Sequence, residues 1–200
     1  MKAFQKAIEL DCDYIETDVQ CTSDKILICY HDKEIDSIPI KALSFEELSQ
    51  KMSAQKINLC TFKDYLSLHI KIQLDIEIKG SGYEDLVWEA IKSIPHYRFV
   101  VKSFNIDVLR TMRGFSNKIK LGYLVQKEED FNSLPKELNL SFISPKLSTL
   151  TNSLLGKAKK LGLEVWPWTI KKKEELKHIR FLGISTVISD IPDVKEKFDG

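Results

Sequence analysis

The chain has 200 residues, of which 43% are hydrophobic and 30% charged, a mixture typical of globular proteins rather than of disordered or fibrous ones. Thirty basic against twenty-nine acidic residues leave a formal net charge of +1, which argues against a protein that binds nucleic acid by neutralising its phosphates. The length fits one domain over residues 1–200. No apolar run reaches the roughly 18 to 20 residues of a membrane span, so we expect no integral membrane segment.

Lysines interrupt the apolar pattern of the first ten residues, MKAFQKAIEL. A secretory signal carries a continuous apolar stretch after its basic residues, and this opening does not. We therefore expect a cytoplasmic protein, provided that no signal peptide lies upstream of Met1.

Short apolar runs alternate with longer amphipathic stretches along the chain. The expected strands cover residues 14–19, 26–30, 73–78, 99–103, 118–125, 140–144, 163–169 and 185–189. The expected helices cover residues 3–10, 44–51, 61–68, 83–94, 106–114, 127–132, 149–161 and 172–182. Gly162 and Gly183 follow two of these helices, where a left-handed residue is favoured, and Ser44 with Glu47 has the spacing of a capping box.

This alternation of strands and helices predicts a parallel sheet. Residues 26–30 follow the preceding strand too closely for a parallel crossover, which needs about a dozen residues or more, so we expect them to form an extra strand. Seven parallel strands remain, and a helix comes before the first of them. The count fits an α/β fold of the (β/α)8 TIM-barrel type whose first strand is missing from this chain; the alternative is an open doubly wound sheet.

Several expected strands end in polar residues, and in such a barrel the chemistry gathers at the carboxyl ends of the strands. Glu16 and Asp18 are two positions apart, as are Glu77 and Lys79, so each pair points to one face of its strand. Three converging carboxylates would suit Mg²⁺ or Ca²⁺ better than zinc. The alternatives are salt-bridged or solvated carboxylates, an internal Glu77–Lys79 ion pair, and a His31 that merely caps a strand end.

The four cysteines Cys12, Cys21, Cys29 and Cys60 form no C-x-x-C pair and have no histidine at zinc-site spacing. A free cysteine behaves as a small hydrophobic residue. We therefore expect buried, reduced thiols rather than a metal or redox site.

Five segments match one known family in order: AFQKAIELDCDYIETDVQCTSDKILICYHD (3–32), LDIEIKG (74–80), VKSFNIDVLRTMR (101–113), VWPWTI (165–170) and ISDIPD (188–193). They resemble the E-x-D strand, the following H-D, the I-E-x-K strand, the S-F strand end, the W-T strand and the closing T-D-x-P segment of the glycerophosphodiester phosphodiesterase family. This family belongs to the phosphatidylinositol-phospholipase-C-like phosphodiesterase superfamily. The similarity covers nearly the whole chain, which makes it more specific than any single motif.

The resemblance implies a (β/α) barrel enzyme that hydrolyses small glycerophosphodiesters to glycerol 3-phosphate and an alcohol, with one divalent cation, Mg²⁺ or Ca²⁺. By position, Glu16, Asp18 and Glu77 resemble the metal ligands of the family, and His31 resembles one of its two catalytic histidines. Lys79 resembles the basic residue that faces the phosphate, and Trp168 a pocket residue near the glycerol. An imidazole exchanges protons near neutral pH, which fits an acid–base role for His31.

The family's opening H-R-G strand end and P-E-N-T helix start have no counterpart in this sequence, which therefore lacks the first catalytic histidine and its arginine. Three explanations remain open: a true start upstream, a decayed remnant, or a variant that has given up hydrolysis. The first hypothesis is a metal-dependent hydrolase of phospholipid head-group diesters. The alternatives are a related barrel phospholipase and a non-catalytic barrel that binds a phosphodiester.

Overall fold

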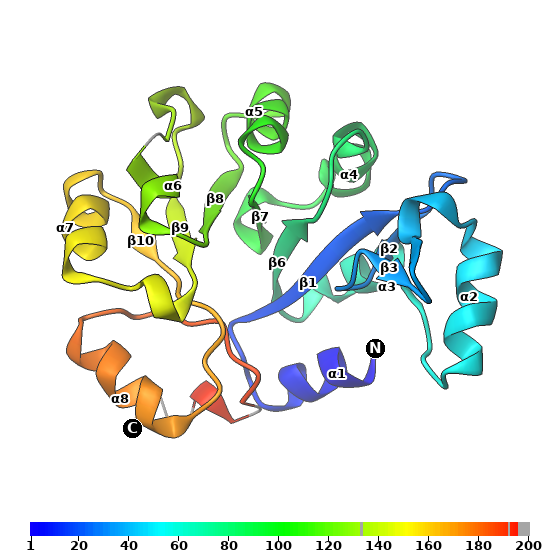
Figure 1. Cartoon of the computed structure of the whole chain (residues 1–200), viewed down its shortest axis with the longest axis horizontal. Helices are drawn as coiled ribbons and strands as arrows, with labels where there is room; N and C mark the ends of the chain where they lie inside the picture. The colour runs from blue at the N-terminus through cyan, green and yellow to red at the C-terminus, as the bar shows by residue number, and fades with distance from the viewer. Residues whose placement is uncertain (133, 192, 196–200) are drawn as a thin grey trace.

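A curved sheet of eight strands forms the centre of the computed structural model, which describes residues 1–132, 134–191 and 193–195 (Figure 1). Across the sheet the strands follow the order β10, β9, β8, β7, β6, β1, β2, β5. Their bounds are β1 Tyr14–Cys21, β2 Leu27–Cys29, β5 Cys60–Thr61, β6 Gln73–Ile78, β7 Phe99–Ser103, β8 Lys120–Val125, β9 Phe142–Pro145 and β10 Glu164–Val165. A small separate hairpin pairs β3 (Glu34–Ile35) with β4 (Ile38–Pro39).

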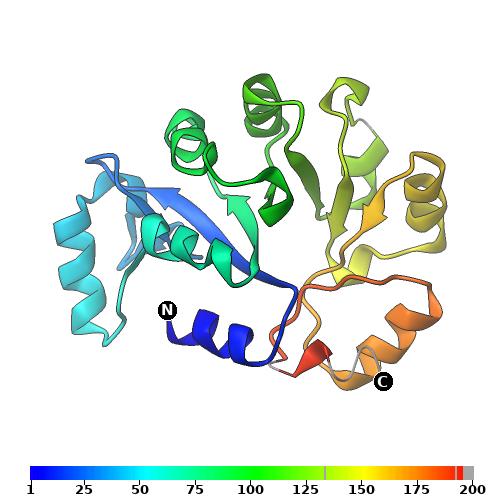
Figure 2. The ribbon, with the colours of Figure 1, turned by 180° about the vertical axis from the view of Figure 1, so that it is seen from behind.

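The helices are α1 Lys2–Glu9, α2 Phe45–Ala54, α3 Phe62–Leu66, α4 Glu84–Ile91, α5 Ile106–Phe115, α6 Glu128–Asn132, α7 Asn152–Lys160 and α8 Lys173–Phe181. Figures 1 and 2 show α4, α5, α6 and α7 together on the outer side of the curved sheet. A doubly wound sheet carries helices on both faces. The barrel-type α/β fold is therefore confirmed over the open-sheet alternative. None of the described helices is long and apolar enough to span a membrane.

Strand pairing follows the predicted pattern. The ladder from β1 through β6, β7, β8 and β9 to β10 is parallel throughout. The extra strand β2 runs antiparallel to β1 and also to β5, as its short connection requires. Gly162 and Gly183 adopt φ of +67° and +73° after α7 and α8, and Ser44 and Glu47 form the capping box at α2.

Two expected strands are mostly absent, whereas others differ from the expected bounds only at their ends. Within residues 163–169 only β10 is a strand, with one isolated bridge from Trp168 to Lys146. Backbone hydrogen bonds to β9 nevertheless continue, from Trp166 and from Trp168. Pro167 faces the other side, where its carbonyl accepts a hydrogen bond from Ile188. Residues 185–189 form only an isolated bridge, between Ser189 and Ile170. Residue 192, in the closing segment that matches the family, lies outside the described residues.

The inner face of the sheet is layered. At its amino end an aromatic layer fills the interior, with Phe142 and Trp166 stacked at 4.1 Å and Tyr14 against Trp166 at 5.2 Å. Gly122 makes room for this layer, because a Cβ there would lie 2.1 Å from the Phe142 ring. Since side chains alternate along a strand, the next inward positions on β1, β6 and β7 lie above this apolar floor, toward the carboxyl ends.

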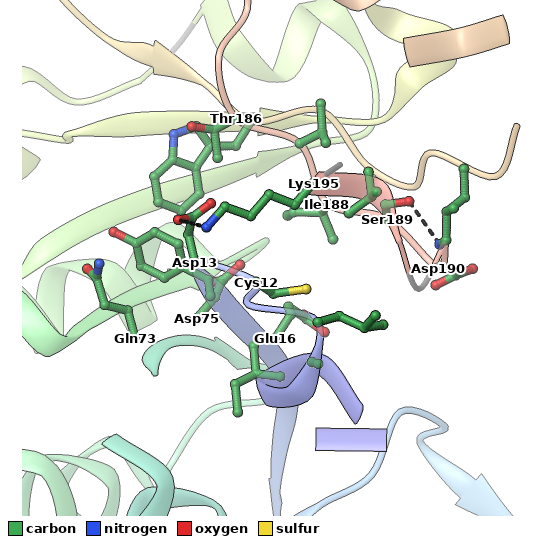
Figure 3. Close-up of a pocket in the computed structure, with 18 of the residues that line it drawn as sticks. Cys12, Asp13, Glu16, Gln73, Asp75, Thr186, Ile188, Ser189, Asp190 and Lys195 are labelled. Carbon is green, nitrogen blue, oxygen red and sulfur yellow. Dashed lines mark hydrogen bonds and ion pairs between the residues drawn. The ribbon is translucent and has the colours of Figure 1, made fainter. Parts of the chain in front are cut away.

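The sheet does not close between β1 and residues 185–189 within the described part of the chain. Asp13 and Val19 accept hydrogen bonds from Gln73 and Lys79 beside them. Along a parallel strand, the backbone groups of alternate residues form hydrogen bonds with the neighbours on opposite sides. The backbone groups of Tyr14 and Glu16 therefore face away from β6. A cavity of about 760 Å³ lies on that side, and residues of α1, β1 and the segment 185–191 line it (Figure 3).

Candidate metal and phosphate site

Three carboxylates meet at the carboxyl end of the two central strands. The register places Glu16 of β1 beside Asp75 of β6, and Asp18 beside Glu77, so all four side chains share the inner face. Oxygens of Glu16, Asp18 and Glu77 lie within 4.8 Å of one another. The structure thus brings together the three residues that the sequence predicted as metal ligands.

Lys79, which follows β6, lies between two of these carboxylates. Its Nζ is 2.9 Å from Asp18 Oδ1 and 3.0 Å from Glu77 Oε1. Burial lowers the pKa of this ammonium, but attraction to Glu77 and Asp18 outweighs burial and raises the pKa above its usual value. Lys79 is therefore a fixed positive charge at the mouth of the barrel.

Lys102 of β7 supplies a second positive charge deeper in the interior, and the sequence analysis missed it. Its side chain is 1% exposed, and its Nζ donates to Asp75 Oδ2 at 2.6 Å and lies 3.2 Å from Glu16 Oε1. A signal was present in the sequence, since a lysine within the apolar run FVVKS is costly to bury without a partner. Asp75, inside the run QLDIEI, carried the same signal.

The site has more negative than positive charge. Four carboxylates face two ammonium groups, which leaves −2 when all are ionised. Burial accordingly raises the pKa of Glu16 to about 8, although Lys102 opposes the shift, and raises the pKa of Glu77, with Asp18 adding repulsion. A group of the opposite charge placed among these oxygens would relieve the repulsion.

The donor set fits a hard divalent cation. All three candidate ligands are carboxylate oxygens, which Mg²⁺ and Ca²⁺ prefer. Glu77 Oε1 is buried and makes no hydrogen bond with any described residue; its ion pair with Lys79 at 3.0 Å lacks hydrogen-bond geometry. A cation could coordinate this buried oxygen beside the Lys79 ammonium, and a charge of +2 would balance the surplus of −2 that the four ionised carboxylates leave.

His31 follows β2 by two residues, in an exposed turn next to β1. Its ring is 76% exposed, and Nδ1 is 2.8 Å from Asp32 Oδ1. Gln20 holds the turn in place by donating from Nε2 to the carbonyls of Tyr30 and Asp32, both at 2.7 Å. Tyr30 in turn donates its N–H to the Asp18 carbonyl at 2.9 Å, which ties the His31 turn to the strand that carries Asp18.

Trp168 lies beyond β10, on the far side of the sheet from His31. Its Nε1 donates to the Ser144 carbonyl at 2.7 Å, and its ring packs edge-on against Phe104 with centroids 5.8 Å apart. Phe104 directly follows β7, where Ser103 donates to the Ile78 carbonyl at 2.8 Å. These two aromatic rings form an apolar corner near the strand ends.

The cavity beside β1 reaches the same polar layer. Glu16 and Asp75 line it from the barrel interior (Figure 3). Asp75 Oδ1 is buried and has no hydrogen-bond partner among the described residues. Glu16 keeps 30% of its side chain exposed, so this carboxylate is accessible from the open side of the barrel.

Comparisons with known proteins point to one family. The sequence profile of the Glycerophosphoryl diester phosphodiesterase family matches residues 1–194. A glycerophosphodiester phosphodiesterase of Caldanaerobacter subterraneus subsp. tengcongensis is 27% identical, over 96% of this chain and 87% of that relative.

Solved structures share the fold. A glycerophosphodiester phosphodiesterase from Thermotoga maritima is 24% identical with a TM-score of 0.81, covering 98% of this chain and 89% of its own. An Oleispira antarctica phosphodiesterase, solved in complex with the product sn-glycerol-3-phosphate, is 18% identical with a TM-score of 0.85. That likeness covers 99% of this chain and 90% of the other.

Proposed function

Because the chain belongs to the glycerophosphoryl diester phosphodiesterase family, we propose that it hydrolyses glycerophosphodiesters to glycerol 3-phosphate and an alcohol, with the help of one divalent cation. The substrates are the deacylated head-group diesters of phospholipids. The observation that carries the proposal is the convergence of Glu16, Asp18 and Glu77 within 4.8 Å beside the ammonium of Lys79.

Glu16, Asp18 and Glu77 would hold the cation, Mg²⁺ or Ca²⁺. When bound, it offsets the negative charge of the phosphodiester and polarises a phosphoryl oxygen. Lys79 is anchored by Asp18 and Glu77 and directs a remaining N–H to a non-bridging phosphate oxygen. Such a preorganised charge stabilises the transition state, where negative charge on those oxygens grows.

His31 transfers the proton that hydrolysis requires. Its Nδ1 lies against Asp32, so Nε2 is the nitrogen that faces the reaction. From Nε2 the imidazolium protonates the oxygen of the departing alcohol, which would otherwise leave as a high-energy alkoxide. Trp168 and Phe104, packed edge-on, provide an apolar wall for the carbon atoms of the glycerol.

A specific observation favours a second candidate, a barrel that binds phosphodiesters without turnover. Of the four histidines, only His31 lies at the mouth of the barrel: the His69 and His96 rings contact the Leu66 carbonyl and the Ser116 hydroxyl, and His178 lies on α8. A single proton-transfer group leaves the attacking water without its own base. This candidate predicts ligand binding without product.

The test is release of glycerol 3-phosphate from glycerophosphocholine with Mg²⁺, with Ca²⁺ and with a chelator. We expect metal-dependent release by the natural chain and loss of at least about 10²-fold in Glu77→Gln, because a neutral amide removes a charged ligand from the site. Glu174→Gln, an exposed carboxylate on α8, is the matched control and should keep full activity.

Circular dichroism of Glu77→Gln separates a lost site from a lost fold. Normal metal-dependent turnover by folded Glu77→Gln would end the assignment of the site. Folded natural chain that glycerophosphocholine protects against thermal unfolding, but that releases no product, would establish the binding-only candidate instead.

A further inference from the structure

Three sulfur atoms from distant parts of the chain meet at the edge of the sheet opposite β10. Cys29 of β2 and Cys60 of β5 are direct partners across the antiparallel pair, and both thiols donate to the Thr61 carbonyl, at 3.8 Å and 3.4 Å. Cys60 Sγ also lies 3.5 Å from Met1 Sδ. All four cysteines of the chain are free, so this pair is not joined covalently.

The register of β2 disfavours a disulfide between the two cysteines. Tyr30 N–H donates to the Asp18 carbonyl, and Thr22 N–H donates to the Ile26 carbonyl. The even-numbered residues of β2 therefore face β1, and Cys29 faces β5. In such a hydrogen-bonded pair the Cβ atoms lie about 5 to 5.5 Å apart, farther than in a non-hydrogen-bonded pair. A disulfide needs Cβ atoms about 3.8 Å apart.

A metal ion held by both sulfurs does not require so short a Cβ separation. Two metal–sulfur bonds of about 2.3 Å hold their sulfurs about 4 Å apart in a trigonal arrangement. The Met1 thioether, 3.5 Å from Cys60 Sγ, supplies the third position. Met1 is 51% exposed whereas Cys60 is 8% exposed, so an ion would enter from the Met1 side.

The two thiols are also electrostatically unequal. The hydrogen bond from Cys29 lowers the pKa of Cys60, while the same bond and burial raise the pKa of Cys29. Cys60 is thus the sulfur that ionises first, with Cys29 donating to it. A cation that binds both sulfurs replaces this shared proton.

We propose that Cys29, Cys60 and Met1 form a binding site for one soft monovalent metal ion, Cu(I). Two thiolates and one thioether select soft ions, whereas the carboxylates of Glu16, Asp18 and Glu77 select hard ones. Binding forms three Cu–S bonds and releases the thiol protons to solvent, and no electron is transferred because the ion enters as Cu(I). The site joins β5 to β2, two residues before His31, and is independent of the proposed hydrolysis.

The first test is an anaerobic titration with Cu(I) supplied as its bicinchoninate complex, whose colour fades as protein removes the ion. We expect the natural chain to take up one tightly held equivalent and Cys29→Ser/Cys60→Ser to lose it. The matched control, Cys12→Ser/Cys21→Ser, should retain it. Equal uptake by folded Cys29→Ser/Cys60→Ser and the natural chain would overturn the proposal.

A second measurement uses the natural sequence and so does not depend on the folding of variants. With one equivalent of Cu(I), alkylation by iodoacetamide should slow at Cys29 and Cys60 but not at Cys12 and Cys21, as mapped by peptide mass spectrometry. In the selenomethionine-substituted protein, X-ray absorption at the copper edge should show two sulfur neighbours and one selenium. Uniform protection of all four cysteines, or a copper ion without a selenium neighbour, would contradict this three-sulfur site.

Discussion

Two clusters of charged side chains lie next to each other on the inner face of the sheet, with their carboxylates two residues apart along β1 and along β6. The inner cluster consists of Glu16, Asp75 and Lys102, and the mouth cluster consists of Asp18, Glu77 and Lys79. Each takes one carboxylate from β1, one from β6 and one lysine. Lys102 is 1% exposed and Asp75 2%, whereas Lys79 and Asp18 are each 13% exposed.

This difference in burial separates two tasks for the same side chains. In the inner cluster Lys102 is enclosed and can only serve its neighbours, by pairing with Asp75 and Glu16 and holding them in position. In the mouth cluster Lys79 retains contact with solvent and therefore with a ligand. The comparison predicts that loss of the inner lysine damages the fold and loss of the outer lysine damages the reaction.

The largest expected effect is that of Lys102→Met on stability. Removing the ammonium leaves the carboxylate of Asp75 buried without its partner, which typically costs about 3 to 5 kcal/mol. Urea unfolding should therefore show a free energy of unfolding lower by about that amount.

Two variants show whether this loss comes from the buried pair. Lys92→Met breaks an exposed pair with Glu89 and should cost less than about 1 kcal/mol. Adding Asp75→Leu to Lys102→Met replaces the pair by apolar groups and should recover much of the stability. If Lys102→Met were no less stable than Lys92→Met, the inner cluster would have no structural role.

Lys79→Met should have the next largest effect, on turnover rather than on the fold. Loss of one preorganised positive charge at a developing oxyanion typically lowers kcat by about 10² to 10³-fold. Release of glycerol 3-phosphate measures this loss, and urea unfolding should show a smaller destabilisation than in Lys102→Met because Lys79 is less buried.

Lys79→Arg keeps the charge and should retain more activity than Lys79→Met, which a purely steric role would not explain. Full turnover in folded Lys79→Met, or a loss of stability equal to that of Lys102→Met, would remove the distinction between the clusters.

The strands that carry these clusters could be predicted closely from sequence, and the pairing of their charges could not. Residues 73–78 and 99–103 match β6 and β7 in full, because both are apolar runs with clear ends. The spacing of Glu16 and Asp18 placed both on one face. Whether Asp75 meets Lys102 depends on strand register, which no local pattern contains.

Other features depended on long-range pairing in the same way. The separation of Cys29 and Cys60 in the sequence does not indicate that they are neighbours. They meet because β2 pairs with β5. The expected strand 163–169 is longer than β10, although Trp166 and Trp168 still donate backbone hydrogen bonds to β9. The helix expected at 83–94 is α4, Glu84–Ile91. The two differ only at their ends, where fraying and capping determine the last helical residue.

The smallest effect expected is a pH dependence of metal binding that comes from Glu16. Burial raises the pKa of this carboxyl to about 8, so below that pH a cation must displace a proton to use Glu16 as a ligand. Mg²⁺ affinity, measured by calorimetry, should therefore rise with pH by at most about tenfold per unit up to pH 8 and level off above it.

The Glu16→Gln variant has no proton to displace, so its weaker affinity for Mg²⁺ should lack the part of this pH dependence that comes from Glu16. An equal slope in Glu16→Gln would show that Glu16 belongs to the inner cluster alone, as a partner of Lys102, and that Asp18 and Glu77 hold the cation without it.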